Sequence, residues 1–279
     1  MFRRYLPLLS CALLVAVWGP SSALAQLAPN LNSEAPFAIV SSTYTNSNTA
    51  PQTIINGQVC YTTPPGTAPI LITGAVTTPC PVATGTDQGN ATAFLNSEAC
   101  TSLGAIVALD SAPGHPTGTY GPGCYSSTGA MNITLGTTVT LSGAGVYIFR
   151  SGGAITTGAN SLVTTANGAC ANDVFWTAIG ATTLGANAVP ALVTPTFIGN
   201  ILDAAGITLG HFANLGGRAL AFGGTVKTDA NTITVPSCSS GAPVPALPPL
   251  ALVALMLLLL LGGAIVVRSR SQSGPRSSV

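Results

Sequence analysis

The chain has 279 residues, of which only 5% are charged and 32 are glycine. Ordinary soluble domains carry about a quarter charged residues, so few side chains here can hold an ionic ligand. Between residues 26 and 241, three basic residues stand against seven acidic ones: Arg150, Arg218 and Lys227 against Glu34, Asp87, Glu98, Asp110, Asp173, Asp203 and Asp229. Because no basic stripe exists, nucleic acid and anionic lipid are poor candidates as partners.

The N-terminal 25 residues are typical of a secretory signal peptide. Two arginines precede an apolar run from Tyr5 to Trp18, and Ala23-Leu24-Ala25 forms a small-x-small cleavage site. Leu8 to Cys11 also resembles the cleavage motif of lipoproteins. Cleavage there would leave an apolar core of only about five residues, which is short for such a region. We therefore expect residues 1–25 to be removed on export.

The C-terminal end predicts a membrane anchor. Residues 250–267 form an uncharged apolar stretch long enough to span a bilayer, and the tail at 268–279 carries Arg268, Arg270 and Arg276. The tail is thus expected in the cytoplasm and the bulk of the chain outside. With the proline-rich neck at 242–249, this order resembles the sorting signals of Gram-negative surface proteins, which implies a membrane sorting protease as a partner. The neck lacks the Pro-Glu-Pro core of the best-known class, so permanent anchoring stays open.

Six of the seven cysteines lie in the part expected outside: Cys60, Cys80, Cys100, Cys124, Cys170 and Cys238. An even number in an oxidising compartment predicts up to three disulfides, although six cysteines allow 15 connectivities. We expect sequence neighbours to pair in the first two bridges, Cys60 with Cys80 and Cys100 with Cys124. None forms a Cys-x-x-Cys pair and the two histidines lie far apart, so no metal or cofactor is expected.

Residues 26–241 contain a repeat that predicts an all-β-dominated fold. Five short units begin 22, 27, 25 and 19 residues apart: Asn132–Gly136, Ala154–Gly158, Ala181–Gly185, Gly206–Gly210 and Thr225–Asp229. A repeat of about twenty residues that tolerates insertions is typical of a β-solenoid. One such insertion is the proline-bearing stretch from Val189 to Pro195.

The third residue of each unit is polar: Thr134, Thr156, Thr183, Thr208 and Lys227. Side chains alternate between the two faces of a strand, so these residues are expected on one outward face. Stacked coils place equivalent residues about 4.8 Å apart. The repeat therefore predicts a ladder of four threonines that Lys227 interrupts.

A helix is expected at about residues 87–108, between the first strands and the repeats. Its apolar residues recur at steps of three and four: Ala91, Phe94, Leu95, Ala99, Leu103, Ile106 and Val107. Asp87 stands where a cap would be placed. We expect this amphipathic helix to lie along the solenoid and cover an apolar flank.

Several segments appear in an order that identifies a family: Ile54–Gly57, Pro65–Thr67, Gly145–Phe149, Asn172–Trp176, Ala181–Gly185, Phe197–Ile201, Gly217–Ala221 and Asn231–Thr234. From about Ala35 to Val235 the chain resembles the ice-binding-like family of secreted, right-handed β-solenoids. The resemblance implies a helix packed beside the coils and a flat outer face that adsorbs to ice.

Ice adsorption is consistent with the four predicted ladder residues, Thr134, Thr156, Thr183 and Thr208. A threonine methyl group limits hydration, while the hydroxyl group holds water. Threonine is also simply a good residue for the solvent face of a strand. A cell-surface adhesin or matrix protein that binds a neutral polymer, such as a polysaccharide, is the alternative that the sequence leaves open.

Catalysis is not expected. Solenoid lyases and hydrolases need clustered acidic or basic residues, whereas Asp173, Asp203 and Asp229 are single acids in the sequence. No hydrolase, nucleotide-binding or zinc-protease motif occurs. The lone His211 is expected to be a surface or hydrogen-bonded residue rather than a base.

Three other conspicuous residues are expected to be structural. Arg218 should bond turn carbonyls or pair with Asp203 or Asp229. Phe175 and Trp176 lie in an apolar stretch and are expected in the core or as a lid on the coil interior.

Overall fold

The computed structural model describes residues 26–188 and 195–238, which fall within one compact unit. The predicted signal peptide (1–25), neck (242–249), apolar span (250–267) and basic tail (268–279) lie outside the described residues, as does most of the insertion after residue 188. Within the described ranges, no helix is long and apolar enough to cross a membrane.

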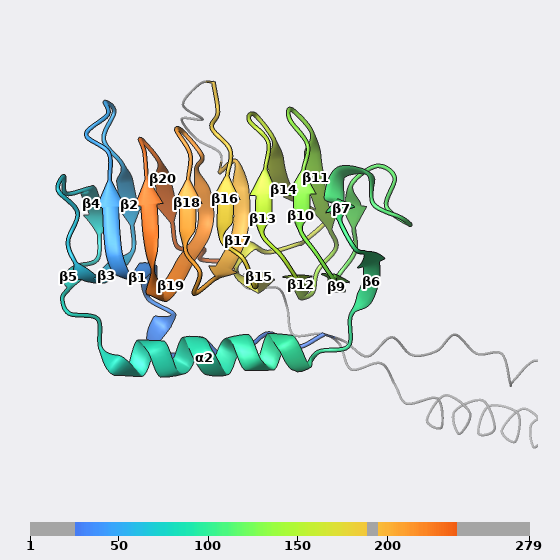
Figure 1. The fold of residues 1–279 in the computed structure, drawn as a ribbon, viewed down its shortest axis with the longest axis horizontal. Coiled ribbons are helices and arrows are strands. Elements are labelled where there is room, and N and C mark those ends of the chain that lie inside the picture. Colours follow the sequence, from blue (N-terminus) through green and yellow to red (C-terminus); the bar gives the residue numbers. More distant parts are fainter. Residues whose placement is uncertain (1–25, 189–194, 239–279) are drawn as a thin grey trace, which may run out of the picture. The chain divides into compact units, whose positions relative to one another are not determined.

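The unit is a β-solenoid, as the repeat predicts, and every pairing between its strands is parallel (Figure 1). The strands of the coils form three faces. Face A carries β6 (Thr101–Gly104), β9 (Gly123–Ser127), β12 (Tyr147–Ser151), β15 (Val174–Ala178), β17 (Phe197–Leu202), the first half of β19 (Leu215–Thr228), the first half of β1 (Phe37–Asn46), β3 (Gln58–Thr63) and β5 (Val76–Thr77).

Face B follows face A along each coil. It carries β7 (Val107–Ala108), β10 (Met131–Ile133), β13 (Ile155–Thr157), β16 (Thr182–Leu184), β18 (Ile207–Leu209) and the second halves of β19 and β1. Face C closes the coils with β8 (Thr119–Tyr120), β11 (Thr138–Ser142) and β14 (Leu162–Ala166) at one end, and with β20 (Thr232–Thr234), β2 (Ile54–Asn56) and β4 (Ile70–Thr73) at the other.

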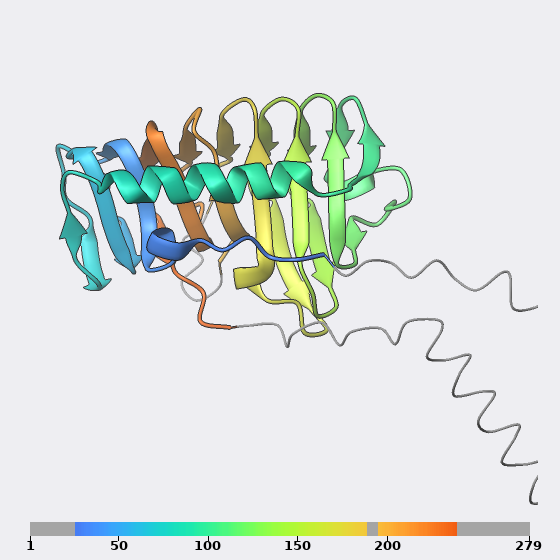
Figure 2. The same ribbon diagram turned by 90° about the horizontal axis from the view of Figure 1, so that it is seen from below.

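The coils do not follow one another in simple chain order. The N-terminal strands build one end of the solenoid, and helix α2 (Val82–Ser97) then carries the chain along face A to the other end (Figure 2). From β6 the coils wind back until β19 lies beside β1. The first strand, β1, therefore meets the late strand β19 at a seam inside the solenoid.

Helix α2 corrects the predicted helix at about 87–108. It begins at Val82 and ends at Ser97, so Asp87 lies within it and is not its cap. The segment from Thr101 to Ala108 forms β6 and β7 instead. There Leu103 and Val107 point into the solenoid, while Ile106 is 77% exposed at a corner. Beyond Ser97, the apolar spacings of three and four residues therefore come from two strands separated by a turn and not from a helix.

The buried stripe of α2 consists of Thr84, Gln88, Ala91 and Leu95, spaced as one face of a helix. It packs on outward-facing residues of face A, which include Ile148, Phe175, Leu202 and Leu220. Near the start of α2, the short 3-10 helix η2 (Asn32–Glu34) is held by Asp87, whose carboxylate accepts a hydrogen bond from the Ser33 amide at 3.1 Å.

Three disulfides tie the chain together. Cys60 pairs with Cys80 and Cys100 with Cys124, which confirms the two predicted bridges, and Cys170 pairs with Cys238. Cys80 stands just before α2 and Cys100 just after it. The helix is therefore bound covalently to face A at both ends.

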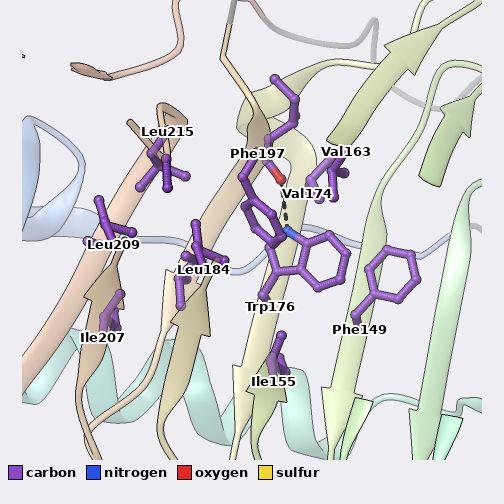
Figure 3. Packing of buried hydrophobic residues seen from close by; sticks show 14 of the residues in the cluster. Phe149, Ile155, Val163, Val174, Trp176, Leu184, Phe197, Ile207, Leu209 and Leu215 are labelled. Atoms are coloured by element: carbon purple, nitrogen blue, oxygen red, sulfur yellow. Dashed lines mark hydrogen bonds between the residues drawn. The ribbon is translucent and has the colours of Figure 1, made fainter. Parts of the chain in front are cut away.

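The interior of the solenoid is a ladder of stacked side chains. Tyr125, Phe149 and Trp176 stand opposite one another on successive coils of face A, and the Phe149 and Trp176 ring centroids lie 4.2 Å apart (Figure 3). The Trp176 indole N–H donates to the Ile198 carbonyl oxygen at 2.8 Å. Further along, the row continues with Ile201 and Ala219, so this row changes from aromatic to aliphatic toward the seam. Two more 3-10 helices, η3 (Leu109–Ser111) and η4 (Ala171–Asp173), lie at coil corners.

Candidate functional site: the flat strip of face B

One outward row runs along the middle of face B. The register of the strands places six residues opposite one another in turn, and we call them the central row: Asn132, Thr156, Thr183, Thr208, Lys227 and Thr45. Three of the four predicted ladder residues, Thr156, Thr183 and Thr208, therefore stand on adjacent strands. Their spacing is about 4.8 Å per step.

Alternation along each strand turns this row outward. Thr183 is exposed between the buried Thr182 and Leu184. Thr208 likewise lies between the buried Ile207 and Leu209. Because the neighbours on both sides fill the interior, the central row cannot turn inward without exposing them.

The rows beside the central row keep the surface flat. On one side lie Gly158, Gly185 and Gly210, and on the other Ala130, Ala154, Ala181 and Gly206. A Cβ atom on Gly185 would lie 2.6 Å from the Gly158 backbone, and one on Gly210 would lie 2.7 Å from the Leu184 carbonyl oxygen. Neighbouring strands thus leave no room for side chains there. Thr156, Thr183 and Thr208 stand on a strip with no flanking side chain larger than a methyl group.

Thr134, the fourth predicted ladder residue, does not belong to the central row. Asn132 stands opposite Thr156 instead, so the first repeat unit is displaced by two residues. Thr134 lies at the corner beside Gly158 and donates its amide and its hydroxyl to the Asp110 carboxylate, at 2.8 and 2.7 Å. Partial burial acts to raise the pKa of Asp110, but these hydrogen bonds outweigh it and lower that pKa. A shift of two residues preserves the in-and-out alternation, so the sequence pattern could not detect it.

A charged corner borders the other end of the strip. The Asp229 carboxylate lies 3.3 Å from His211 Nδ1 and accepts a hydrogen bond from the Ser47 hydroxyl. Slight burial acts to raise the pKa of Asp229, but the bonds from Ser47 and His211 lower it. Because the serine hydroxyl binds the aspartate and not the histidine, the cluster does not activate a nucleophile.

Two features of the surface were missed by the sequence analysis. Thr45 belongs to β1, which carries no recognisable repeat, yet it occupies the row next to Lys227. Face C also carries a short row of its own, in which Thr119, Thr140 and Thr164 stand in register. The Val-Thr pairs at 139–140 and 163–164, which follow β10 and β13, are the sequence signal that could have revealed the second row.

The other singled-out residues are structural. Arg218 is only 5% exposed and donates to the Ala35 carbonyl oxygen and to the side-chain oxygens of Asn172 and Asn200. The predicted hydrogen bond from Arg218 to a turn carbonyl is confirmed, whereas the predicted alternative, an ion pair of Arg218 with Asp203 or Asp229, is wrong. Phe175 and Trp176 are both buried, but Phe175 packs under α2 and Trp176 in the solenoid interior.

Asp203 also has a structural role. Its carboxylate accepts hydrogen bonds from the Thr182 hydroxyl at 2.6 Å and from the Ala205 amide at 2.9 Å. Burial raises the pKa of this carboxyl, which the hydrogen bonds partly oppose. Asp203 and Asp229 are thus held by different neighbours and do not form an acid pair.

Fold and strip together define the class of the protein: a parallel β-solenoid with one helix alongside and a flat, threonine-bearing strip on one strand face. Comparison with known protein families supports this class. The model of the ice-binding-like family matches residues 38–234, so the chain belongs to the ice-binding-like family.

Two relatives illustrate the similarity. The ice-binding protein of Flavobacterium frigoris is 36% identical over 118 residues, which cover 42% of this chain and 40% of that protein. The ice-binding protein of a Nostoc species is 31% identical over 199 residues, 68% of both chains. The match thus spans about two fifths of the Flavobacterium protein and two thirds of the Nostoc protein.

Solved structures share the fold. An ice-binding protein from an Antarctic biological consortium superposes with a TM-score of 0.63 at 23% identity, covering 78% of this chain and 96% of that one. A domain of ice-binding protein 1 from Shewanella frigidimarina gives a TM-score of 0.62 at 24% identity, with coverage of 77% and 100%. At these identities the likeness establishes the architecture alone.

Proposed function

We propose that the protein binds ice by adsorption through face B, with Thr156, Thr183 and Thr208 at the centre of contact and without catalysis. The observation that carries this proposal is the register of the three threonines on a strip with no larger side chain beside them. Such a strip holds water through regularly spaced hydroxyl groups, and its methyl groups and bare backbone limit competing hydration. The ice-binding names of the relatives support it.

Thermal hysteresis and inhibition of ice recrystallisation test this proposal. Residues 26–241, purified with the disulfides intact, should show both. If neither effect appears at high protein concentration while the fold is intact, the ice proposal is wrong. A neutral polymer would then be the better candidate ligand for the strip.

Thr183→Tyr locates the active face. We expect it to lower thermal hysteresis by about tenfold, because a ring projecting from the strip blocks contact and a loss of about 1.4 kcal/mol already changes a binding constant tenfold. The matched control is Thr140→Tyr, at the middle of the face C row. If Thr140→Tyr lowers activity and Thr183→Tyr does not, face B is not the contact surface.

We further propose that the protein is exported and held at the cell surface by the C-terminal segment, at least until a protease acts on the neck. The support is the order of proline-rich neck, apolar stretch and basic tail in the sequence. Cell fractionation tests this: a membrane-bound form should be detected. Full-length protein found only in the medium would contradict anchoring, and a secreted form lacking about the last 30 residues would identify a removable signal.

A further inference from the structure

The central row of face B does not end where its threonines end. Beyond Thr208 it continues through Lys227 to Thr45, which stands opposite Lys227 across the seam between β19 and β1. Both residues are exposed, and their neighbours Val226 and Tyr44 are fully buried. Thr45 is therefore directed outward like Thr208, although it lies on a distant part of the chain.

Lys227 differs from the rest of the row in the two properties that matter for contact with a flat surface. Its four-carbon stem extends beyond the height of a threonine, and its ammonium group is a strongly hydrated point charge. A crystal plane that contacts Thr156, Thr183 and Thr208 must therefore lose contact at Lys227. Thr45 lies one strand too far to be reached.

The solenoid itself has no evident need for a lysine here. Among the described residues, Lys227 forms no salt bridge and no side-chain hydrogen bond. The nearby Asp229 is engaged by His211 and Ser47. Threonine is at least as well suited to an exposed strand position as lysine. Replacement should therefore leave the fold unchanged.

We infer that face B is a composite plane assembled from β1 and from the strands that follow α2, and that Lys227 is the residue that limits its length. This inference rests on the proposed ice-binding function. With a threonine at position 227, five threonines would stand in unbroken register: positions 156, 183, 208, 227 and 45. Their span would grow from about 10 Å to about 19 Å.

The test is a gain of activity. Lys227→Thr should raise thermal hysteresis at equal protein concentration by about 1.5- to 2-fold, because close contacts add along the row. Lys227→Gln removes the charge but keeps a long side chain, so it should give a smaller gain. Unchanged circular dichroism and melting temperature would show that the fold is the same.

Thr45→Tyr decides whether the gain comes from the extended row. It should have little effect in the natural chain, where Lys227 already ends the contact, and should abolish the gain in the Lys227→Thr background. An equal loss in both backgrounds would overturn the inference, as would a folded Lys227→Thr variant with no gain. Thr183→Tyr in the same assay tests the proposed function separately, because it blocks the row at a position that does not depend on Lys227. If Thr183→Tyr lowers activity but Lys227→Thr gives no gain, the proposed function stands and only this inference is wrong.

Discussion

The carboxyl group of Glu34 is buried in an unusual setting. The side chain is fully buried in η2, and neither carboxyl oxygen has a hydrogen-bond partner among the described residues. Burial raises its pKa to about 8, the Asp87 carboxylate adds to this, and Arg218 partly opposes it. The native fold therefore favours the protonated acid at neutral pH.

This setting predicts a loss of stability with rising pH. The folded pKa lies above the unfolded value of 4.5, so the folded state holds the extra proton between about pH 4.5 and 8. The free energy of unfolding should fall across that window and level off above it. Glu34→Gln should remove this slope and be more stable than the natural chain at pH 9 by about 5 kcal/mol, since the pKa rises from 4.5 to about 8. Denaturant unfolding at several pH values measures it.

Measuring the unfolding of Glu34→Gln at low pH provides the control. At pH 4 both the acid and the amide are neutral, so the two proteins should then unfold with similar free energies. An undiminished slope in Glu34→Gln would assign the pH dependence to another group. Asp87 and Arg218 are the charged groups that act on Glu34, so they would be examined next.

At the residue scale, the sequence predicted which side chains point outward but not which of them are neighbours. Alternation placed Thr156, Thr183 and Thr208 correctly. It could not distinguish Asn132 from Thr134, because a shift of two residues leaves the alternation unchanged. The Asp110 carboxylate, which binds Thr134, belongs to the preceding coil, and such a contact between coils has no signal in the repeat.

At the scale of elements, α2 owes its stability to its attachments. Gly85, Gly89 and several threonines weaken it as an isolated helix, and its first residue has no side-chain cap. Arg150 donates to the Asn96 carbonyl oxygen at 2.6 Å, and Gln88 accepts the Phe222 amide at 2.7 Å. Disulfides join both ends to face A. Local propensity is therefore a poor guide to where this helix begins and ends.

Removing one disulfide tests this dependence. With Cys100 and Cys124 both replaced by serine, hydrogen exchange in the last turns of α2 should accelerate, and the free energy of unfolding should fall by about 2–3 kcal/mol. Removing the Cys170–Cys238 bridge serves as the control, because it should leave exchange in α2 unchanged. Equal exchange in α2 for both variants would show that packing alone holds the helix.

At the scale of the whole molecule, the repeat predicted a solenoid but not the order of its coils. The units from residue 130 onward stack in sequence order, which a repeat can reveal. The pairing of β1 with β19 joins segments that share no repeat, so the seam was not predicted. Thr45 was missed for the same reason.

The seam also bears on how the protein forms. The hydroxyl groups of Tyr44 and Thr228 meet across it at 2.9 Å, although the two residues are 184 positions apart in the chain. Closing so long a loop is slow. In addition, β1 cannot pair with β19 until β19 has been synthesised. A nascent or truncated chain can therefore stack coils of its own but cannot present the whole of face B. The surface becomes complete only when the beginning and the end of the domain have both been made.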